Sequence, residues 1–202
     1  MNALDLRHKY FHDRGCRISD HGIKYFFAKD YTENEIDGIT KKILSGNDLN
    51  MKEIHKFKSS FLYEIAKLNH KRNWVQQFHV GALRNVNTRL FNELGPDIGC
   101  DTIGDRNYGE QMAKFLDKLD QSNQLTKTIL YNLNPRDNEL IAAMTVFFQD
   151  ATVPGKIQCG PSWWFLDQID GMTKKINTLS NLGLLSRFIG MTTDSRSFLS
   201  FP

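Results

Sequence analysis

The stretch Lys127-Thr-Ile-Leu-Tyr-Asn-Leu-Asn-Pro135 carries the pattern on which the fold assignment rests. Its apolar run, residues 127–132, is closed by Asn134 and Pro135, as expected of a buried strand that ends in a turn. Asp137 is then placed to cap a helix. Apolar residues follow at helical spacing at Leu140, Ile141, Met144, Phe147 and Phe148. The stretch therefore predicts one strand–helix unit.

The same alternation continues on both sides of this unit. Further strands are predicted at 15–21, 74–80, 156–160 and 187–193, the last ending at Asp194. Helices between the strands are predicted from a capping-box signature at Thr32 and Glu35 and from apolar stripes over 54–68, 112–119 and 169–179. The polar, glycine-containing segment 81–105 is too long for a simple turn, which is typical of a functional or mobile segment.

Strands joined by helical crossovers predict an α/β protein with a parallel sheet. An open doubly wound sheet and part of a (β/α)8 barrel both fit this pattern. The barrel accounts better for the polar or aromatic residues at the carboxyl end of every predicted strand. No GxGxxG motif follows a strand, so the dinucleotide-binding fold gains no support.

Composition limits the classes of function. The chain has 202 residues, of which 40% are hydrophobic and 24% charged, as expected of one soluble domain. Its formal charge of +3 is small and its basic residues are dispersed, so nucleic-acid binding is not supported. Without a signal pattern or a long apolar run, a reducing, cytoplasmic setting is expected. Cys16, Cys100 and Cys159 lie far apart, which argues against disulfides or a zinc knuckle.

Candidate chemistry is concentrated where strands end. Asp194 and Arg196 are two residues apart, so on an extended chain their side chains point to the same side. At the carboxyl end of a parallel strand, such a pair serves a metal, a proton transfer or an anionic substrate. The alternative is a surface ion pair or a helix cap.

His79 also ends an apolar strand, where a histidine can bind a metal, move a proton or simply occupy the core. Asp20 and His21 end the first strand, where an Asx turn or a cap at Asp20 is the favoured interpretation. The remaining histidines lie in helical, charge-rich stretches and are predicted to face solvent: His8, His12, His55 and His70.

Two further groups fit a polar substrate. Arg84 can hold a carboxylate through two hydrogen bonds, and Asn85 can contact hydroxyl groups, although Asn also stabilises loops. Trp163 and Trp164 follow the fourth predicted strand. If strand alternation continues there, the two rings face opposite ways, and one of them can form the wall of a sugar site.

Several blocks of the chain resemble the uronate isomerase family, also called glucuronate isomerase. These blocks, in chain order, are Cys16-Arg-Ile-Ser-Asp-His-Gly22, His79-Val-Gly-Ala-Leu-Arg-Asn85, Gly95-Pro-Asp-Ile-Gly99, Lys127-Thr-Ile-Leu-Tyr-Asn-Leu-Asn-Pro135, Trp163-Trp-Phe-Leu-Asp167 and Gly190-Met-Thr-Thr-Asp-Ser-Arg-Ser-Phe-Leu-Ser200. They span nearly the whole chain in one order, which makes the resemblance specific.

The resemblance implies a distorted (β/α)8 barrel of the amidohydrolase superfamily. It implies an aldose–ketose isomerase that interconverts D-glucuronate with D-fructuronate and D-galacturonate with D-tagaturonate, with one divalent cation, usually zinc. Asp194 then matches a metal ligand and proton-transfer group, and His79 an active-site histidine and second candidate ligand. Arg196 matches an arginine on substrate oxygens, and Trp163 a tryptophan near the substrate. A homo-oligomer is expected.

The chain departs from the family in length and in one motif. Family members are about twice as long, and the HxH metal pair of their first strand is absent. We therefore expect residues 1–202 to be the carboxyl-terminal part of a single (β/α)8 catalytic domain, covering about strands 4 to 8. Such a part leaves open sheet edges and is expected to be inactive alone. The alternatives are a metal-dependent hydrolase of the same superfamily and a catalytically inert assembly domain.

Overall fold

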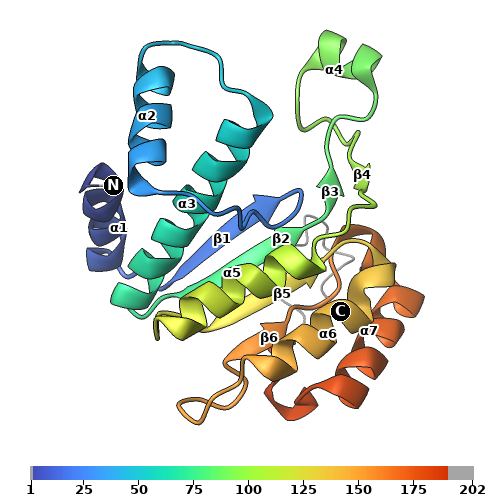
Figure 1. The fold of residues 1–202 in the computed structure, drawn as a ribbon. Coiled ribbons are helices and arrows are strands. Elements are labelled where there is room, and N and C mark those ends of the chain that lie inside the picture. Colours follow the sequence, from blue (N-terminus) through green and yellow to red (C-terminus); the bar gives the residue numbers. More distant parts are fainter. Residues whose placement is uncertain (1, 191–202) are drawn as a thin grey trace. The chain divides into compact units, whose positions relative to one another are not determined.

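The computed structural model describes residues 2–190 and confirms the α/β class with a mostly parallel sheet. Figure 1 shows the arrangement of the strands and helices. The main sheet has the order β1-β2-β5-β6. Its strands are β1 (Ile18–Ile23), β2 (Val75–Val80), β5 (Thr128–Asn132) and β6 (Ile157–Cys159). Four of the predicted strands are thus present, with bounds shifted by up to a few residues.

Backbone hydrogen bonds show the parallel register of β2 and β5. Gln76 N–H donates to the Lys127 carbonyl over 2.9 Å, and Leu133 N–H donates to the Val80 carbonyl over 3.2 Å. The partner numbers rise together along both strands, which is the parallel arrangement. Parallel strands that are covered on both faces read as continuous apolar runs, and every residue of β5 is buried.

The predicted fifth strand is wrong over the part that the structure describes. Leu185–Arg187 form a short 3-10 helix, η3, and residues 188–190 are not in a strand. Arg187 N–H donates to the Leu184 carbonyl and Phe188 N–H to the Leu185 carbonyl, so local turns use the groups that a strand would pair with a neighbour. The rest of that prediction, including Asp194 and Arg196, lies outside the described residues.

The chain forms two compact units, which we describe separately. Unit 1 comprises residues 1–77 and 106–128, and unit 2 comprises residues 78–105 and 129–202. The expectation of a single catalytic domain stays a prediction.

Unit 1 contains long helices with strong start signals. The helices are α1 (Asn2–Asp13), α2 (Glu33–Leu44), α3 (Met51–Lys71) and α5 (Gly109–Gln121). The predicted capping box of α2 is confirmed, since Thr32 and Glu35 satisfy each other's backbone N–H groups, and Asn50 and Glu53 do the same for α3. The apolar faces of α3 and α5 meet in a core that includes Leu62, Ala66, Met112, Leu116 and Leu119.

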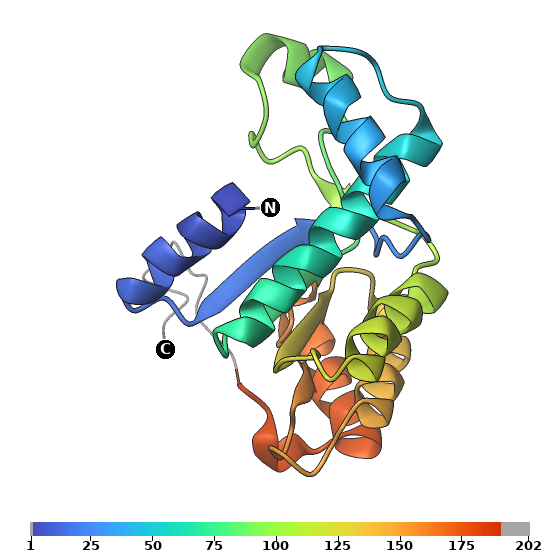
Figure 2. The ribbon, with the colours of Figure 1, turned by 60° about the vertical axis from the view of Figure 1, so that its left-hand side comes forward.

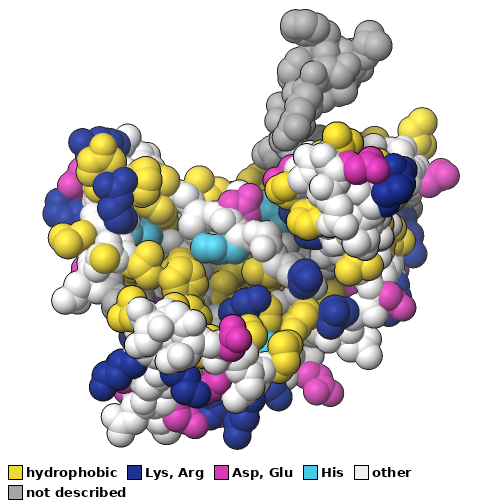
Figure 3. Space-filling view, turned by 90° about the horizontal axis from the view of Figure 1, so that it is seen from above, with side chains coloured by type: hydrophobic (Ala, Val, Ile, Leu, Met, Phe, Trp, Pro, Cys, Tyr) yellow, Lys and Arg dark blue, Asp and Glu magenta, His cyan; other side chains and the backbone are white. Residues whose placement is uncertain are grey.

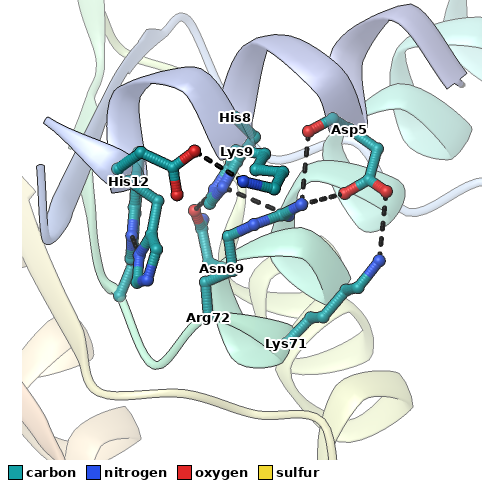
Figure 4. Close-up of polar contacts among 9 residues, drawn as sticks. Asp5, His8, Lys9, His12, Asn69, Lys71 and Arg72 are labelled. Atoms are coloured by element: carbon teal, nitrogen blue, oxygen red, sulfur yellow. Dashed lines mark hydrogen bonds and ion pairs between the residues drawn. The ribbon is translucent and has the colours of Figure 1, made fainter.

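One end of α3 fixes both β1 and α1. Figures 1 and 2 show α3 lying beside β1, and Asn69 Nδ2 donates to Ser19 Oγ over 2.9 Å. Figure 4 shows how α1 meets the same end of α3: Asp5 pairs with Arg72 at 2.5 Å and with Lys71 at 3.0 Å. Because α1 has no buried residue, these polar contacts carry much of its attachment.

The histidines of this region correct the prediction that they face solvent. His8 is half-buried and stacks on Trp74, with ring centroids 3.8 Å apart. His12 is also half-buried, and its Nδ1 accepts a hydrogen bond of 3.0 Å from Trp74 Nε1. His55 Nε2 bonds to the Tyr25 hydroxyl at 2.9 Å. Of the four, only His70 is exposed as predicted. The other three predictions are wrong because helical spacing cannot show which aromatic rings the fold brings to a histidine.

In unit 2, the segment 81–105, which was predicted to be irregular, forms a hairpin and a short helix. β3 (Ala82–Leu83) pairs with β4 (Thr102–Ile103) in antiparallel register, with Ala82 opposite Ile103. Besides β6, η3 and most of β5, this unit contains α4 (Thr88–Leu94), η1 (Pro135–Asp137), α6 (Asn138–Phe147), η2 (Trp164–Leu166) and α7 (Ile169–Leu182). The helices α6 and α7 pack against each other.

The start of α6 differs from the prediction in one detail. Asp137 occupies the N-cap position, but its side chain makes no capping hydrogen bond. Its carboxylate accepts from Arg136 Nε at 3.1 Å instead. The capping side chain is Asn134, whose Oδ1 accepts from Arg136 N–H at the start of η1. A 3-10 turn that begins at Pro135 precedes the helix, so the capping residue is Asn134, before that turn.

The described surface agrees with the dispersed charge read from the sequence. Figure 3 shows basic and acidic side chains interspersed on the face that it views. Among residues 2–190, no helix is both long enough and apolar enough to cross a membrane.

Candidate functional site

A cluster of aromatic rings surrounds His79 in unit 2. The His79 ring stacks on Tyr131, with centroids 4.1 Å apart and an interplanar angle of 13°. Trp163 meets the same imidazole edge-on at 4.7 Å. His79 lies near the carboxyl end of β2, Tyr131 near that of β5, and Trp163 shortly after β6. The three residues come from neighbouring strands, which explains how positions distant in sequence meet. We call His79, Tyr131 and Trp163 the His79 cluster.

Strand alternation presents the histidine. Along β2 the burial alternates, with Phe78 and Val80 fully buried and His79 half-buried between them. Successive side chains of a strand point to opposite faces, so His79 lies on the face opposite the two apolar residues. A half-buried imidazole between aromatic rings keeps a fixed orientation and still has part of its surface accessible.

Gly160 makes room for the Tyr131 ring. A Cβ atom built on Gly160 would lie 2.3 Å from two carbons of that ring. The Gly160 N–H donates to the Leu130 carbonyl over 2.8 Å, which holds the glycine beside β5. The stack between Tyr131 and His79 therefore depends on a residue without a side chain at the end of β6.

Strand alternation does not continue through the paired tryptophans, so the condition under which their rings would face opposite ways is not met. The Trp163 and Trp164 ring centroids are 4.6 Å apart, at 41°. The strand has already ended at Cys159, and Trp164 adopts a left-handed φ of 46° as it begins η2. This turn of the backbone brings the two rings together on one side.

Arg84 extends the cluster with a positive charge. Its guanidinium lies 4.9 Å from the centre of the Trp164 ring, a cation–π distance. The same guanidinium donates to Asp101 at 2.5 Å and lies 4.0 Å from Asp97. Arg84 is therefore oriented by both an aromatic face and a carboxylate.

Asp101 joins the loop segments on which Arg84 and Asn85 lie. Its Oδ1 accepts from the Asn85 backbone N–H at 2.9 Å. This hydrogen bond, together with the one from Arg84, lowers the pKa of Asp101. Asn85 has a left-handed φ of 54°, a conformation that asparagine tolerates well. The structure thus brings together His79, Trp163 and, through Trp164, Arg84, and it engages the Asn85 backbone in holding Asp101.

Sequence reasoning missed Tyr131 and Asp101. Tyr131 is part of the stretch that predicted the central strand, and a polar-tipped aromatic one position before the strand end is a weak signal for a site. No sequence pattern indicated Asp101, because only the pairing of β3 with β4 brings it close to Arg84.

The described residues do not make up a metal site by themselves. Among residues 2–190, no group of three or more His, Cys, Asp or Glu side chains is placed to hold a metal ion. His79 is the one predicted ligand in this part of the chain, and its partner Asp194 lies outside it.

Comparisons with known proteins give one consistent answer. The family model described as glucuronate isomerase matches residues 1–202. The uronate isomerase of Cellvibrio japonicus is 58% identical over 201 residues, which are 100% of this chain and 43% of that protein. The chain thus spans less than half the length of this curated relative.

Solved structures agree with the sequence comparison. The crystal structure of uronate isomerase from Thermotoga maritima superposes with a TM-score of 0.89 at 34% identity, covering 99% of this chain and 43% of that one. Glucuronate isomerase from Caulobacter crescentus gives a TM-score of 0.84 at 27% identity, covering 98% of this chain and 40% of that one. With its fold and its whole sequence matched, the chain belongs to the glucuronate isomerase family.

Proposed function

We propose that the protein to which this chain belongs is an aldose–ketose isomerase of hexuronates. It interconverts D-glucuronate with D-fructuronate and D-galacturonate with D-tagaturonate. The observation that carries the proposal is the His79 cluster, an oriented imidazole between two aromatic rings at the carboxyl ends of parallel strands. Family membership over the whole chain supports it.

The residue types suit the reaction. Isomerisation moves a proton between C1 and C2 of the sugar acid, and this needs a group that gives and takes a proton beside the reacting carbons. His79 is our candidate for that role, since an imidazole exchanges protons near neutral pH. The indole of Trp163 offers an apolar wall for a sugar ring.

The substrate carboxylate needs a cation. Arg84 is one candidate, because a guanidinium matches a carboxylate geometrically. Arg84 already pairs with Asp101, so a substrate carboxylate would either bind Arg84 together with Asp101 or displace Asp101 from it. Arg196 is the other candidate for substrate oxygens, and Asn85 for hydroxyl groups. Asp194 is our candidate base and a ligand of a divalent cation, zinc being the proposed metal. His79 is the candidate second ligand if it does not carry the proton.

We further propose that the chain is part of a (β/α)8 barrel of the amidohydrolase superfamily, covering about strands 4 to 8, and that the barrel is cytoplasmic and homo-oligomeric. A sheet of this size cannot close a barrel, so the site lacks the groups supplied by the remaining strands. We expect the chain alone to have no isomerase activity.

The test is an assay of glucuronate-to-fructuronate conversion with and without added zinc. It is run on the 202-residue chain and on a version extended to the length of its relatives. Activity is expected only in the extended protein, and turnover by the chain alone would contradict our view of its incomplete site.

A pair of histidine variants then tests the role of His79 in the extended protein. His79→Gln is expected to lower kcat by about 100-fold, the usual contribution of a proton-transfer group. His70→Gln, which alters an exposed histidine at the end of α3, serves as the control and is expected to leave kcat unchanged. Equal activity in both variants would remove His79 from the chemistry.

A further inference from the structure

We propose that Lys175, a lysine buried in α7, is a positioning residue that holds the ends of β2 and β5 in place for the His79 cluster. The proposal rests on the proposed function only in taking that cluster as the site. It concerns a residue outside the His79 cluster that gave no signal in the sequence.

The burial of Lys175 needs an explanation. The residue is 3% exposed, and within residues 2–190 it forms no ion pair. Its Nζ donates to Asn132 Oδ1. Burial lowers the pKa of Lys175, since an ammonium loses its water shell, while nearby Cys159, Glu139 and Asp137 oppose the shift. An apolar side chain would fill the same space with no desolvation cost, so the amino group serves something other than packing.

The contact with Lys175 fixes the orientation of the Asn132 amide. Because Oδ1 faces the lysine, Nδ2 is available as a donor, and it bonds to the Asn134 carbonyl at 2.8 Å and to Asn138 Oδ1 at 2.8 Å. A flipped amide would place the NH2 group against the amino group and lose all three contacts. Asn132 is the last residue of β5 and directly follows Tyr131, the ring on which His79 stacks.

The hydrogen bonds continue from Asn134 toward the end of β2. Asn134 Nδ2 donates to the Gly104 carbonyl at 3.1 Å, and the Gly104 N–H donates to the Gly81 carbonyl at 2.8 Å. The two glycines are in close backbone contact, since a Cβ on Gly104 would lie 2.6 Å from the Gly81 oxygen. Gly81 is two residues after His79.

These hydrogen bonds run from Lys175 through Asn132, Asn134 and Gly104 to Gly81, and we call them the relay. The relay reaches the Tyr131 ring through Asn132 and the His79 ring through Gly81. Every member belongs to unit 2. Buried polar networks specify one arrangement only when all their members are satisfied, so removing the amino group is expected to release the relay rather than merely lower stability.

The test uses the 202-residue chain and reads the His79 ring by nuclear magnetic resonance. The Cε1–H signal of His79, assigned by its loss in His79→Gln, reports the ring currents of Tyr131 and Trp163. Lys175→Met removes the amino group and keeps the volume, and it is expected to move this signal toward that of an unstacked histidine. Lys174→Met, which alters the exposed neighbouring lysine of α7, is the control and is expected to leave the signal in place.

A third variant keeps the experiment decisive if Lys175→Met does not fold. Asn132→Asp keeps an acceptor for Lys175 but removes the Nδ2 donor, so it is expected to shift the His79 signal in the same direction. An unchanged His79 signal in a folded Lys175→Met protein, or in Asn132→Asp when the first variant does not fold, would overturn the proposal. The readout needs no turnover, so its result is independent of whether the proposed isomerase activity is found.

Discussion

In unit 1, His8 and His12 lie against Trp74, whereas in unit 2 His79 lies between Tyr131 and Trp163. The unit 1 rings are fixed by hydrogen bonds to their nitrogens. His8 Nε2 lies 3.0 Å from Asn69 Oδ1, and its Nδ1 lies 3.4 Å from an Arg72 nitrogen. The Tyr131 ring stacks on the His79 ring and the Trp163 ring meets it edge-on. The two clusters therefore place their histidines against different sets of aromatic rings.

The difference shows how to separate a structural histidine from a candidate catalytic one. The nitrogens of His8 and His12 contact an asparagine, an arginine and an indole and hold α1 in place, and Arg72 opposes a proton gained on His8. The His79 ring lies near the ends of parallel strands, in a cluster that Arg84 extends, where it is placed to exchange protons with a ligand.

The largest effect is expected from Gly160→Ala in unit 2. The added methyl group would overlap the Tyr131 ring at 2.3 Å, so the stack with His79 must shift. We expect a loss of about 3 kcal/mol in the free energy of unfolding, measured by urea denaturation. Gly38→Ala is the control, because its Cβ meets nothing within 4 Å on the exposed side of a helix, and it should stabilise by about 0.5 kcal/mol or more. Equal effects would show that the contact with Tyr131 does not matter.

Trp→Phe substitutions compare the two clusters directly. Trp74→Phe removes the donor to His12 and some buried volume, and we expect a loss of about 2 kcal/mol in unfolding free energy. Trp163 is half-buried and donates no hydrogen bond to another described residue, so Trp163→Phe should cost about 1 kcal/mol or less. Thermal and urea unfolding of both variants measures the difference. The contrast fails if Trp163→Phe proves the more costly.

Asp101→Asn tests the anchoring of Arg84. The carboxylate accepts from both Arg84 and the Asn85 N–H, and an amide can keep only one oxygen acceptor. We expect a loss of about 1 kcal/mol in unfolding free energy and a change in the fluorescence of Trp164, over which Arg84 lies. Asp97→Asn is the matched control, as Asp97 is largely exposed and 4.0 Å from Arg84. A loss of the same size in both variants would contradict the anchoring role of Asp101.

The smallest effect is the pH dependence that His8 gives to unit 1. Burial, the largest cause, lowers the pKa of His8 below its ordinary value of 6.5, and Arg72 adds to the shift. As the pH falls below about 6.5, the unfolded chain takes up this proton before the folded one, so the free energy of unfolding decreases. The groups that face His8 are Asp5 and His12 on α1, Asn69 on α3, and Arg72 at the C-cap of α3.

Urea unfolding at pH 7.5 and pH 5.5 measures this pH dependence. His8→Gln is expected to reduce the loss of stability on acidification, whereas His70→Gln, on the exposed histidine, should leave it unchanged. A pH dependence that survives His8→Gln in full would assign it to other groups.

The α/β class, the four strands of the main sheet, the capped start of α2 and the family could all be predicted from the sequence. These follow from local patterns, since apolar runs, helical stripes and capping boxes act within a few residues. It also identified His79, Trp163, Arg84 and Asn85 as candidates, because strand ends can be read along the chain. The assignments of Asp194 and Arg196 remain predictions.

The contacts of these residues depend on tertiary packing. The stack of His79 on Tyr131, the return of Asp101 to Arg84 and the buried contact of Lys175 with Asn132 join positions from different elements. Strand alternation does not reach Trp164, where a left-handed turn intervenes, and Trp74 covers His8 and His12, which the helical pattern predicts to face solvent. The physical reason is common to all of them: contact partners are chosen by the packing of distant segments, which local periodicity does not encode.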